Sequence, residues 1–333
     1  MQTIKDTLLT LARAYGATGR ESNIASTIRG MIEPYVDEIT TDALGNLIAT
    51  RKGGSKKIMV AAHMDHIGFI VTHIDKKGFL RVHNVGGINR ANSLNRRVVF
   101  ANGVNGVLSH EVEDFSPANS PMSKLFIDIG ARSREEAEAM VDVGDVAVYA
   151  PDVFEMGRRV SGPAMDNRAG CALLVEALKA LESRENTVVA VFTTQEEVGL
   201  RGAAGAAYGV APDEGVALDV TLCGDTPKGV KISVELGAGI AVKVMDSSLI
   251  CAPSMVKALE SAAERAGAKH QREVLTGGGT DAGAIAQSRG GVPSGVLSIS
   301  AMASPMKPRP CVSKTPPALS QSCVSSVSTD RRI

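Results

Sequence analysis

The sequence predicts an α/β protein with a central, mostly parallel sheet flanked by helices and a small β-rich domain inserted into it. Two observations carry this prediction. Helical and strand patterns alternate over residues 1–68 and again over 158–300, whereas residues 69–157 hold short apolar segments separated by Gly, Asn and Pro. The chain of 333 residues is also longer than a typical single domain. We therefore expect a discontinuous α/β domain, an inserted domain, and an atypical tail over residues 301–333.

The α/β part begins with two amphipathic helices, separated by "GATGRESN", and a hairpin turn over residues 42–46. The run Ile58–Ala62 has no polar alternation, which is typical of a strand covered on both faces in a parallel sheet. The elements predicted here are helices over 4–14, 24–35, 168–181 and 254–266, and strands over 58–62, 188–192, 216–218 and 295–299. In the insertion we expect strands in "FLRVHNV", "RVVFANGV", "LFIDIG" and "DVAVYAP", with one helix near residues 133–140.

Composition excludes several classes of function. The 36 basic and 36 acidic side chains cancel, which argues against nucleic-acid or membrane-surface binding through bulk charge. No apolar run approaches the roughly 20 residues that span a bilayer, and the N-terminal helix does not resemble a signal peptide. The five cysteines form no C-x-x-C pair, which indicates reduced thiols and a cytoplasmic location.

Ionisable side chains follow several of the predicted strands. Because ligands gather beyond the carboxyl ends of parallel strands, these side chains should meet at one edge of the sheet. They are His63 and Asp65 after the strand 58–62, Asp166 before the helix 168–181, Glu196 and Glu197 after the strand 188–192, and Asp219 at the end of "GVALDV". Imidazole and carboxylate together suit a divalent transition metal such as zinc, cobalt or manganese.

Each residue also has a simpler interpretation by itself. His63 could be a hydrogen-bonded core histidine, Asp166 a helix N-cap, and Glu196–Glu197 a solvated loop. None of these interpretations explains why four segments all end in acids or imidazole, so a metal site is favoured. Neighbouring side chains in extended backbone point in opposite directions, so one glutamate could bind metal while the other handles protons.

Five motifs resemble those of the M42 metallo-aminopeptidases, which include glutamyl aminopeptidases and tetrahedral, dodecameric peptidases. In order they are "AAHMDHIG", "SGPAMDNRAG", "TTQEEVGLRGA", "ALDVTLCGDTP" and "GGGTDAGA". The resemblance covers roughly residues 5–300. It implies a zinc-peptidase-like fold, peptide substrates, and self-association as a dimer or dodecamer through the insertion.

The resemblance also implies two divalent metal ions per subunit. One would be held by His63, Asp166 and Asp219, and the other by Glu197 and the bridging Asp166. Glu196 would then be the general base, and Asp65 the carboxylate that orients His63.

The glycine-rich stretch "GGGTDAGA", residues 277–284, allows close backbone approach. A phosphate loop is the alternative, but the stretch lacks the Lys-Ser/Thr ending and a strand before it. Because the family has this turn beside the active site, the resemblance implies substrate contact by Gly279, Thr280 and Asp281.

The chain departs from the family pattern in two places. His66 stands where the family has Glu in H-x-D-E-[IV]-G. The family also takes a last metal ligand from a His after the final strand, in a segment like R-Y-x-H-S, whereas no histidine follows His270 here. The tail is rich in Ser and Pro and is predicted to be disordered. A natural lineage-specific tail and an out-of-frame C-terminus both stay open as explanations.

Three functions follow for testing. The favoured one is a metal-dependent aminopeptidase that removes N-terminal residues from short peptides. The second is a catalytically impaired subunit that keeps the fold and one metal ion. The third is a related amidohydrolysis, such as deacylation, on the same scaffold.

Overall fold

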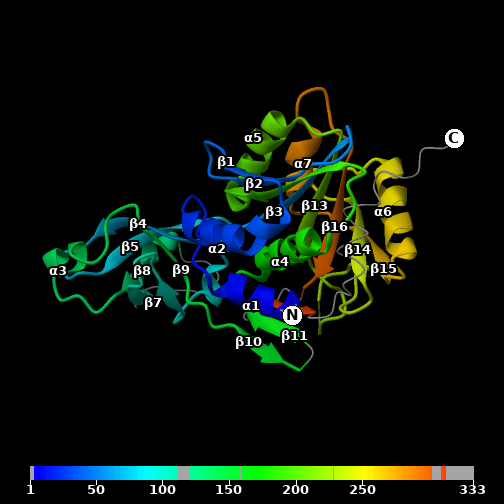
Figure 1. The fold of residues 1–333 in the computed structure, drawn as a ribbon. Helices are drawn as coiled ribbons and strands as arrows, with labels where there is room; N and C mark the ends of the chain where they lie inside the picture. The colour runs from blue at the N-terminus through cyan, green and yellow to red at the C-terminus, as the bar shows by residue number, and fades with distance from the viewer. Residues whose placement is uncertain (1–3, 112–120, 158, 228, 302–308, 313–333) are drawn as a thin grey trace.

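The computed structural model of the chain describes residues 4–111, 121–157, 159–227, 229–301 and 309–312. It has an α/β body and, to one side of it, a β-barrel (Figure 1). The predicted fold class is confirmed: a mixed, mostly parallel sheet is flanked by helices on both faces.

The main sheet has eight strands. Their order is β1 (Glu38–Thr41), β2 (Leu47–Arg51), β12 (Thr187–Thr193), β3 (Lys57–His63), β13 (Glu214–Thr221), β16 (Ser294–Ser300), β14 (Ile240–Met245) and β15 (His270–Val274). The four central strands, β12, β3, β13 and β16, are parallel, whereas β2 and β14 run antiparallel to their central neighbours. The carboxyl ends of these four strands therefore share one edge.

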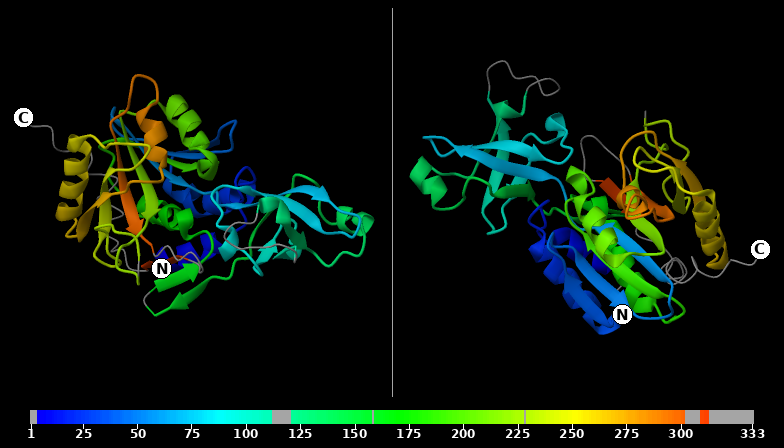
Figure 2. Two further views of the ribbon diagram at one scale, coloured as in Figure 1. Left: turned by 180° about the vertical axis from the view of Figure 1, so that it is seen from behind. Right: turned by 90° about the horizontal axis from the view of Figure 1, so that it is seen from above.

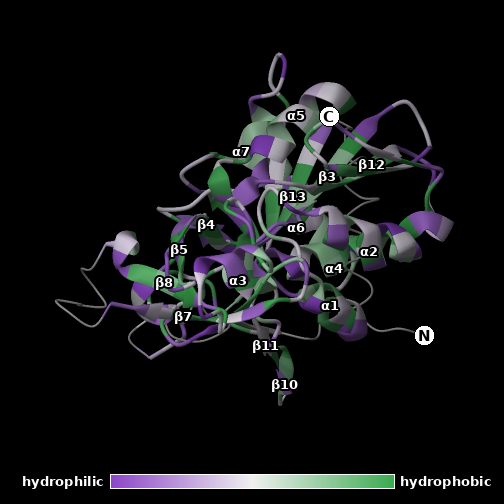
Figure 3. Ribbon diagram, turned by 90° about the vertical axis from the view of Figure 1, so that its left-hand side faces the viewer, coloured by the Kyte–Doolittle hydropathy of each residue, from purple (hydrophilic) through white to green (hydrophobic). Residues whose placement is uncertain are grey.

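Helices cover both faces of this sheet, as the predicted lack of polar alternation requires. Even-numbered positions of β3, such as Ile58 and Val60, pack into the core on one face, and Met59 and Ala61 pack into the core on the other. The first face is covered by α1 (Ile4–Arg13), α2 (Ser22–Ile32), α4 (Met165–Ala180) and α6 (Pro253–Arg265), and the second by α5 (Arg201–Val210) and α7 (Asp281–Ala286). Figure 3 shows the apolar residues concentrated on the central strands.

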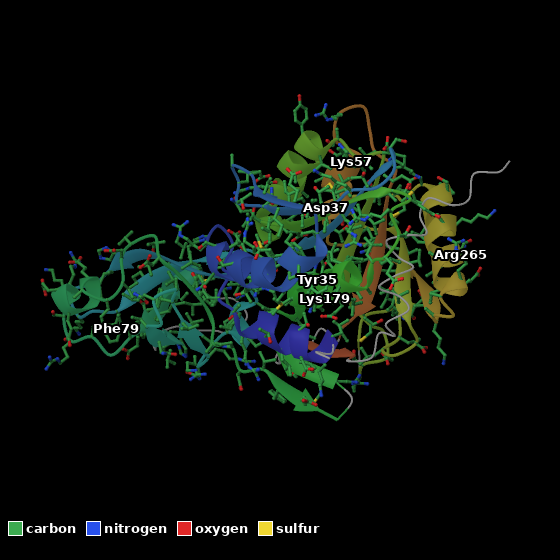
Figure 4. The ribbon with its side chains drawn as sticks, in the orientation of Figure 1. Tyr35, Asp37, Lys57, Phe79, Lys179 and Arg265 are labelled. Atoms are coloured by element: carbon green, nitrogen blue, oxygen red, sulfur yellow. The ribbon has the colours of Figure 1, made fainter. Side chains whose placement is uncertain are left out.

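The barrel is closed and has its own core. Its strand order is β4 (Gly68–Ile74), β5 (Leu80–Val85), β8 (Leu125–Asp128), β7 (Asn105–His110), β6 (Arg97–Val99) and β9 (Val146–Tyr149), and α3 (Arg134–Glu138) confirms the helix predicted there. Figure 2 shows the barrel projecting from the α/β body. Phe79, on the barrel, stacks edge-on against Phe126 with ring centroids 5.0 Å apart, and it lies at the opposite end of the molecule from Arg265 of α6 (Figure 4).

Short 3₁₀ helices complete the chain: η1 (Glu33–Tyr35), η2 (Arg90–Asn92), η3 (Met122–Lys124) and η4 (Glu196–Val198). A third sheet joins β10 (Phe154–Met156), β11 (Arg159–Gly162) and β17 (Arg309–Val312), all antiparallel. The prediction that the tail is disordered is wrong for β17, because these four residues of the tail pair with β11. A strand this short relies on backbone pairing, which composition does not reveal. Residues 302–308 and 313–333 of the tail lie outside the described residues.

Candidate metal centre

His63 is the last residue of β3 and the only imidazole in either group of potential metal ligands in the described chain. Its side chain is 2% exposed. Nε2 lies 3.1 Å from Oδ1 of Asp166, 3.7 Å from Oδ1 of Asp219 and 3.9 Å from Oε2 of Glu196. The parallel strands β3 and β13 and the segments after β11 and β12 thus bring one imidazole and three carboxylates together, as the sequence predicts.

Asp166 lies near the start of α4, and it does not cap that helix. The neighbouring Asn167 does so instead: its Oδ1 accepts the backbone N–H of Gly170 at 2.9 Å, and its side-chain amide donates to the carbonyl of Leu218 on β13 at 2.8 Å. The N-cap interpretation of Asp166 is therefore wrong, and its carboxylate faces His63.

Asp65 follows β3 by two residues and is fully buried. Its Oδ1 is 3.4 Å from Nδ1 of His63, whose Nδ1 also lies 3.1 Å from the Asp65 carbonyl oxygen. These two oxygens of Asp65 accept hydrogen bonds, so they favour the tautomer of His63 with its hydrogen on Nδ1. The lone pair of Nε2 is then available to bind a cation. The geometry agrees with the orienting role expected of Asp65.

Glu196 and Glu197 lie in η4, a helical turn, so the expected extended backbone is wrong at this point. Their side chains nevertheless reach different partners. Ligand atoms of Glu196, His63 and Asp219 lie within 4.8 Å of one another, and so do those of Glu197, His63 and Asp166. This grouping places Glu196, rather than Asp166, with His63 and Asp219.

Charge is poorly balanced in this cluster. Burial opposes protonation of His63, but the carboxylates of Glu196, Asp166 and Asp219 hold its pKa well above the ordinary value. Burial raises the pKa of Glu196 to about 10, where Asp219 adds to the effect and His63 opposes it. Burial also raises the pKa of Asp219. These carboxylates gather more negative charge than one imidazolium can neutralise, and a divalent cation with oxygen and nitrogen ligands fits such a donor set.

The glycine-rich turn places Thr280 and Asp281 at the start of α7, both 2% exposed. The hydroxyl of Thr193, at the end of β12, donates to Oδ2 of Asp281, whereas Oδ1 has no hydrogen-bond partner among the described residues. Thr280 donates to Asp246 at 3.4 Å. Both side chains thus contact the protein interior, and substrate contact by Gly279, Thr280 and Asp281 stays a prediction.

Position 66, where the family has Glu, is buried. Arg168, whose charge acts on His66, is completely buried. Its guanidinium donates to the carbonyls of Leu11, Ala14 and Gly16, at the C-terminal end of α1. Burial, with the nearby Arg168 charge, lowers the pKa of His66 to about 3, so the ring is neutral at physiological pH.

Sequence reasoning missed Thr18, Glu21 and Cys171. Thr18 and Glu21 lie in "GATGRESN", which has only the signature of a turn, yet they contact Asp65 and the segment before Glu196. Cys171 donates from Sγ to the carbonyl of His63 at 3.1 Å. No local signal distinguishes these residues, because their partners are distant in sequence.

The family model described as M42 glutamyl aminopeptidase matches residues 45–305. A provisionally named aminopeptidase of Acetivibrio thermocellus is 50% identical over 284 residues, which are 85% of this chain and 86% of that protein. The chain therefore belongs to the M42 peptidases, a family of aminopeptidase hydrolases.

Solved structures agree with this assignment. The aminopeptidase APDkam598 of the archaeon Desulfurococcus kamchatkensis superposes with a TM-score of 0.89 at 35% identity, over 97% of this chain and 93% of that one. The TET1 peptidase of Pyrococcus horikoshii, which can assemble into a tetrahedron or a large octahedral shell, gives a TM-score of 0.81 at 33% identity, over 93% and 94%. Separately, none of the helices in the described part of the chain combines the length and apolarity that crossing a membrane requires.

Proposed function

We propose that this chain is a metal-dependent aminopeptidase that hydrolyses N-terminal residues from short peptides. The observation that carries the proposal is the convergence of Asp166, Glu196 and Asp219 on Nε2 of His63, within 3.1–3.9 Å. A divalent ion bound there would polarise the scissile carbonyl and lower the pKa of the attacking water. Zinc, cobalt and manganese all suit the donor set.

The residues of the site divide the remaining work. His63, Asp166 and Asp219 hold the cation, and Asp65 fixes the His63 ring through Nδ1. Glu197, grouped with Asp166, is a further ligand. Glu196 takes a proton from the attacking water and delivers it to the leaving amine, a role that its burial beside the cluster supports.

Two ions per subunit are the expectation from the family, and this chain offers an incomplete set for the second. Its last histidine, His270, begins β15, three strands from β13, and belongs to neither ligand group. We propose one firmly held ion at His63 and a second held weakly through Asp166 and Glu197. If the second ion is essential, the chain is a catalytically impaired subunit.

The test is a peptidase assay on aminoacyl p-nitroanilides, with added zinc or cobalt and metal analysis of the same samples. Turnover that depends on added metal supports the aminopeptidase. Bound metal without turnover supports the impaired subunit. A panel that compares free with blocked N-termini separates aminopeptidase from deacylase, because only a deacylase prefers the blocked substrates.

We further propose that residues 1–68 and 158–300 are the catalytic unit, that residues 69–157 build homo-oligomers, and that residues 301–333 are a separate tail. The assembly described for the P. horikoshii peptidase supports oligomers here, from dimer to dodecamer.

We also propose a cytoplasmic location. Its support is that Cys171, Cys223 and Cys251 are buried free thiols, as expected in a reducing compartment.

A further inference from the structure

The turn that carries Glu196 is held by carboxylates from two distant segments. The first N–H groups of a helical turn have no partner within that turn and need one elsewhere. Here the N–H of Gln195 donates to Oε1 of Glu21 at 3.2 Å, that of Glu196 to Oδ1 of Asp65 at 3.0 Å, and that of Glu197 to Oδ2 of Asp65 at 3.3 Å. Three consecutive N–H groups are thus satisfied by two buried acids.

Glu21 directs its side chain to this turn rather than to its own helix. It occupies the N-cap position of α2, where an acidic side chain often accepts an N–H of the first turn, but it makes no such cap. Instead Oε1 accepts the N–H of Gly19 at 2.6 Å as well as that of Gln195, and the residue is only 6% exposed. A buried carboxylate that forgoes its local cap is explained by the contact with Gln195.

Thr18 holds the other acid. Its hydroxyl donates to Oδ2 of Asp65 at 2.8 Å, which is the oxygen that also accepts the N–H of Glu197. The backbone of the same segment pairs with the residues after β3, since Thr18 N–H donates to the carbonyl of His66 and His66 N–H donates to the carbonyl of Gly16. Residues 16–21 therefore contact both the segment after β3 and the turn after β12.

The turn needs such support because its backbone is locally unfavourable. Gln195 adopts φ 53°, in the left-handed region that non-glycine residues rarely occupy. It also presents two adjacent acids to different groups, Glu196 to His63 and Asp219, and Glu197 to His63 and Asp166. A small rotation of the turn would move both carboxylates, and a misplacement of about 1 Å can cost 10²-fold in rate.

We propose that Glu21 and Thr18 are positioning residues for the reaction: they fix the orientation of Glu196, Glu21 through Gln195 and Thr18 through Asp65. This rests on the proposed role of Glu196 as general base. Neither residue belongs to a group of candidate metal ligands, and both act on the orientation of Glu196, so their removal should lower kcat with little change in KM.

Two matched pairs of variants test this in the metal-loaded enzyme. Glu21→Ala removes the acceptor, whereas Glu21→Gln keeps an oxygen that can accept the N–H of Gln195. Thr18→Val removes the hydroxyl, whereas Thr18→Ser keeps it. We expect Glu21→Ala and Thr18→Val to lower kcat by about 10–100-fold, and Gln and Ser to restore most of it. The control is Glu33→Ala, an exposed acid at the other end of α2, which should match wild type.

Deuterium exchange of the amides of residues 195–197 gives a readout independent of activity. It should be faster in Glu21→Ala than in wild type or Glu21→Gln. Equal exchange in Glu21→Ala and wild type, or an unchanged kcat in both Glu21→Ala and Thr18→Val, would overturn the proposal. If Glu21→Ala does not fold, the Thr18 pair provides the same test, because exchange at residues 195–197 should then be faster in Thr18→Val than in Thr18→Ser.

A double-mutant cycle distinguishes this proposal from the proposed function. If Glu21 acts through Glu196, Glu21→Ala should cause no further loss in a Glu196→Gln background. An equal loss in both backgrounds shows that Glu21 acts by another route. Near-normal activity of Glu196→Gln alone instead contradicts the base assignment, whatever Glu21 does.

Discussion

Replacing Glu196 and Glu197 by Gln, one at a time, tests how the two adjacent acids divide the chemistry. Gln has nearly the shape of Glu, and the backbone N–H of each residue still reaches Asp65. Glu196→Gln removes a proton acceptor, so kcat should fall by about 10²–10⁴. That loss corresponds to about 3–5 kcal/mol of transition-state stabilisation.

The metal content of Glu196→Gln should stay near that of wild type. Asp166 and Asp219 remain, with oxygens 3.1 and 3.7 Å from Nε2 of His63. Glu197→Gln should instead lower metal occupancy, because it deletes one of the few ligands left for the second ion.

Both variants can be measured with an aminoacyl p-nitroanilide at saturating cobalt, with metal content determined after gel filtration. Wild type that has been treated identically is the control. The division of roles is refuted if Glu196→Gln keeps near-normal kcat, or if it loses as much metal as Glu197→Gln. The second outcome would make Glu196 a ligand, as its grouping with His63 and Asp219 allows.

Other properties follow from the same electrostatics and architecture. Metal binding at pH 7 should release at least one proton, and the affinity for the metal ion should rise with pH. The reason is that the pKa of His63 is raised well above its ordinary value and that of Glu196 to about 10. Calorimetry in buffers of different ionisation enthalpy measures the number of protons released, and a value of zero would contradict the prediction. Because the pKa of His66 is lowered to about 3 in the folded state, the contribution of His66 to stability should fall as pH drops below about 6.5. In metal-free protein, His66→Gln should reduce the loss in unfolding free energy between pH 7 and pH 5 by up to about 2 kcal/mol, and parallel pH profiles would exclude the effect. Replacing residues 69–157 by a short linker should give a smaller assembly by light scattering, and an unchanged number of subunits would assign the barrel another role.

Much of the site follows from local patterns. The apolar run of β3 predicts a strand buried on both faces, and the strand-end rule then places His63 and Asp219 at one edge without knowledge of their distance. What the patterns do not reveal is which acid contacts which atom. The hydrogen bonds from the N–H groups of Glu196 and Glu197 to Asp65 join segments more than 100 residues apart, and Glu21 has an unremarkable position in a glycine-containing turn.

Some of the elements that were missed have weak local propensity. α5 was not predicted, since its sequence RGAAGAAYGV holds three glycines, which disfavour a helix. One of them is required by packing: a Cβ at Gly202 would lie 2.3 Å from the carbonyl oxygen of Thr194. Close approach there lets α5 follow the turn of Glu196 directly. Propensity is overridden by tertiary contacts in this helix, as it is by backbone pairing in β17.

The tail is where family expectation and chain differ most, and the fold shows why this matters. β16 is parallel to β13, so the chain leaves it at Ser300 on the edge that carries His63 and Asp219. A ligand from the next residues would enter the site directly, yet residues 301–329 contain no His, Asp or Glu, and the family match ends at 305.

An out-of-frame C-terminus would explain why the residues after β16 contain no metal ligand. Ala301-Met302 is encoded by GCN-ATG, which in the shifted frame permits Arg-Tyr, the pair that opens the missing family segment. The expected protein binds one ion tightly and a second weakly, which metal titration measures; two tight ions would refute the incomplete site. The coding DNA tests the cause independently: a shifted frame that encodes an Arg-Tyr-x-His-like segment and an amphipathic helix supports it, whereas stop codons throughout that frame leave a natural tail as the explanation.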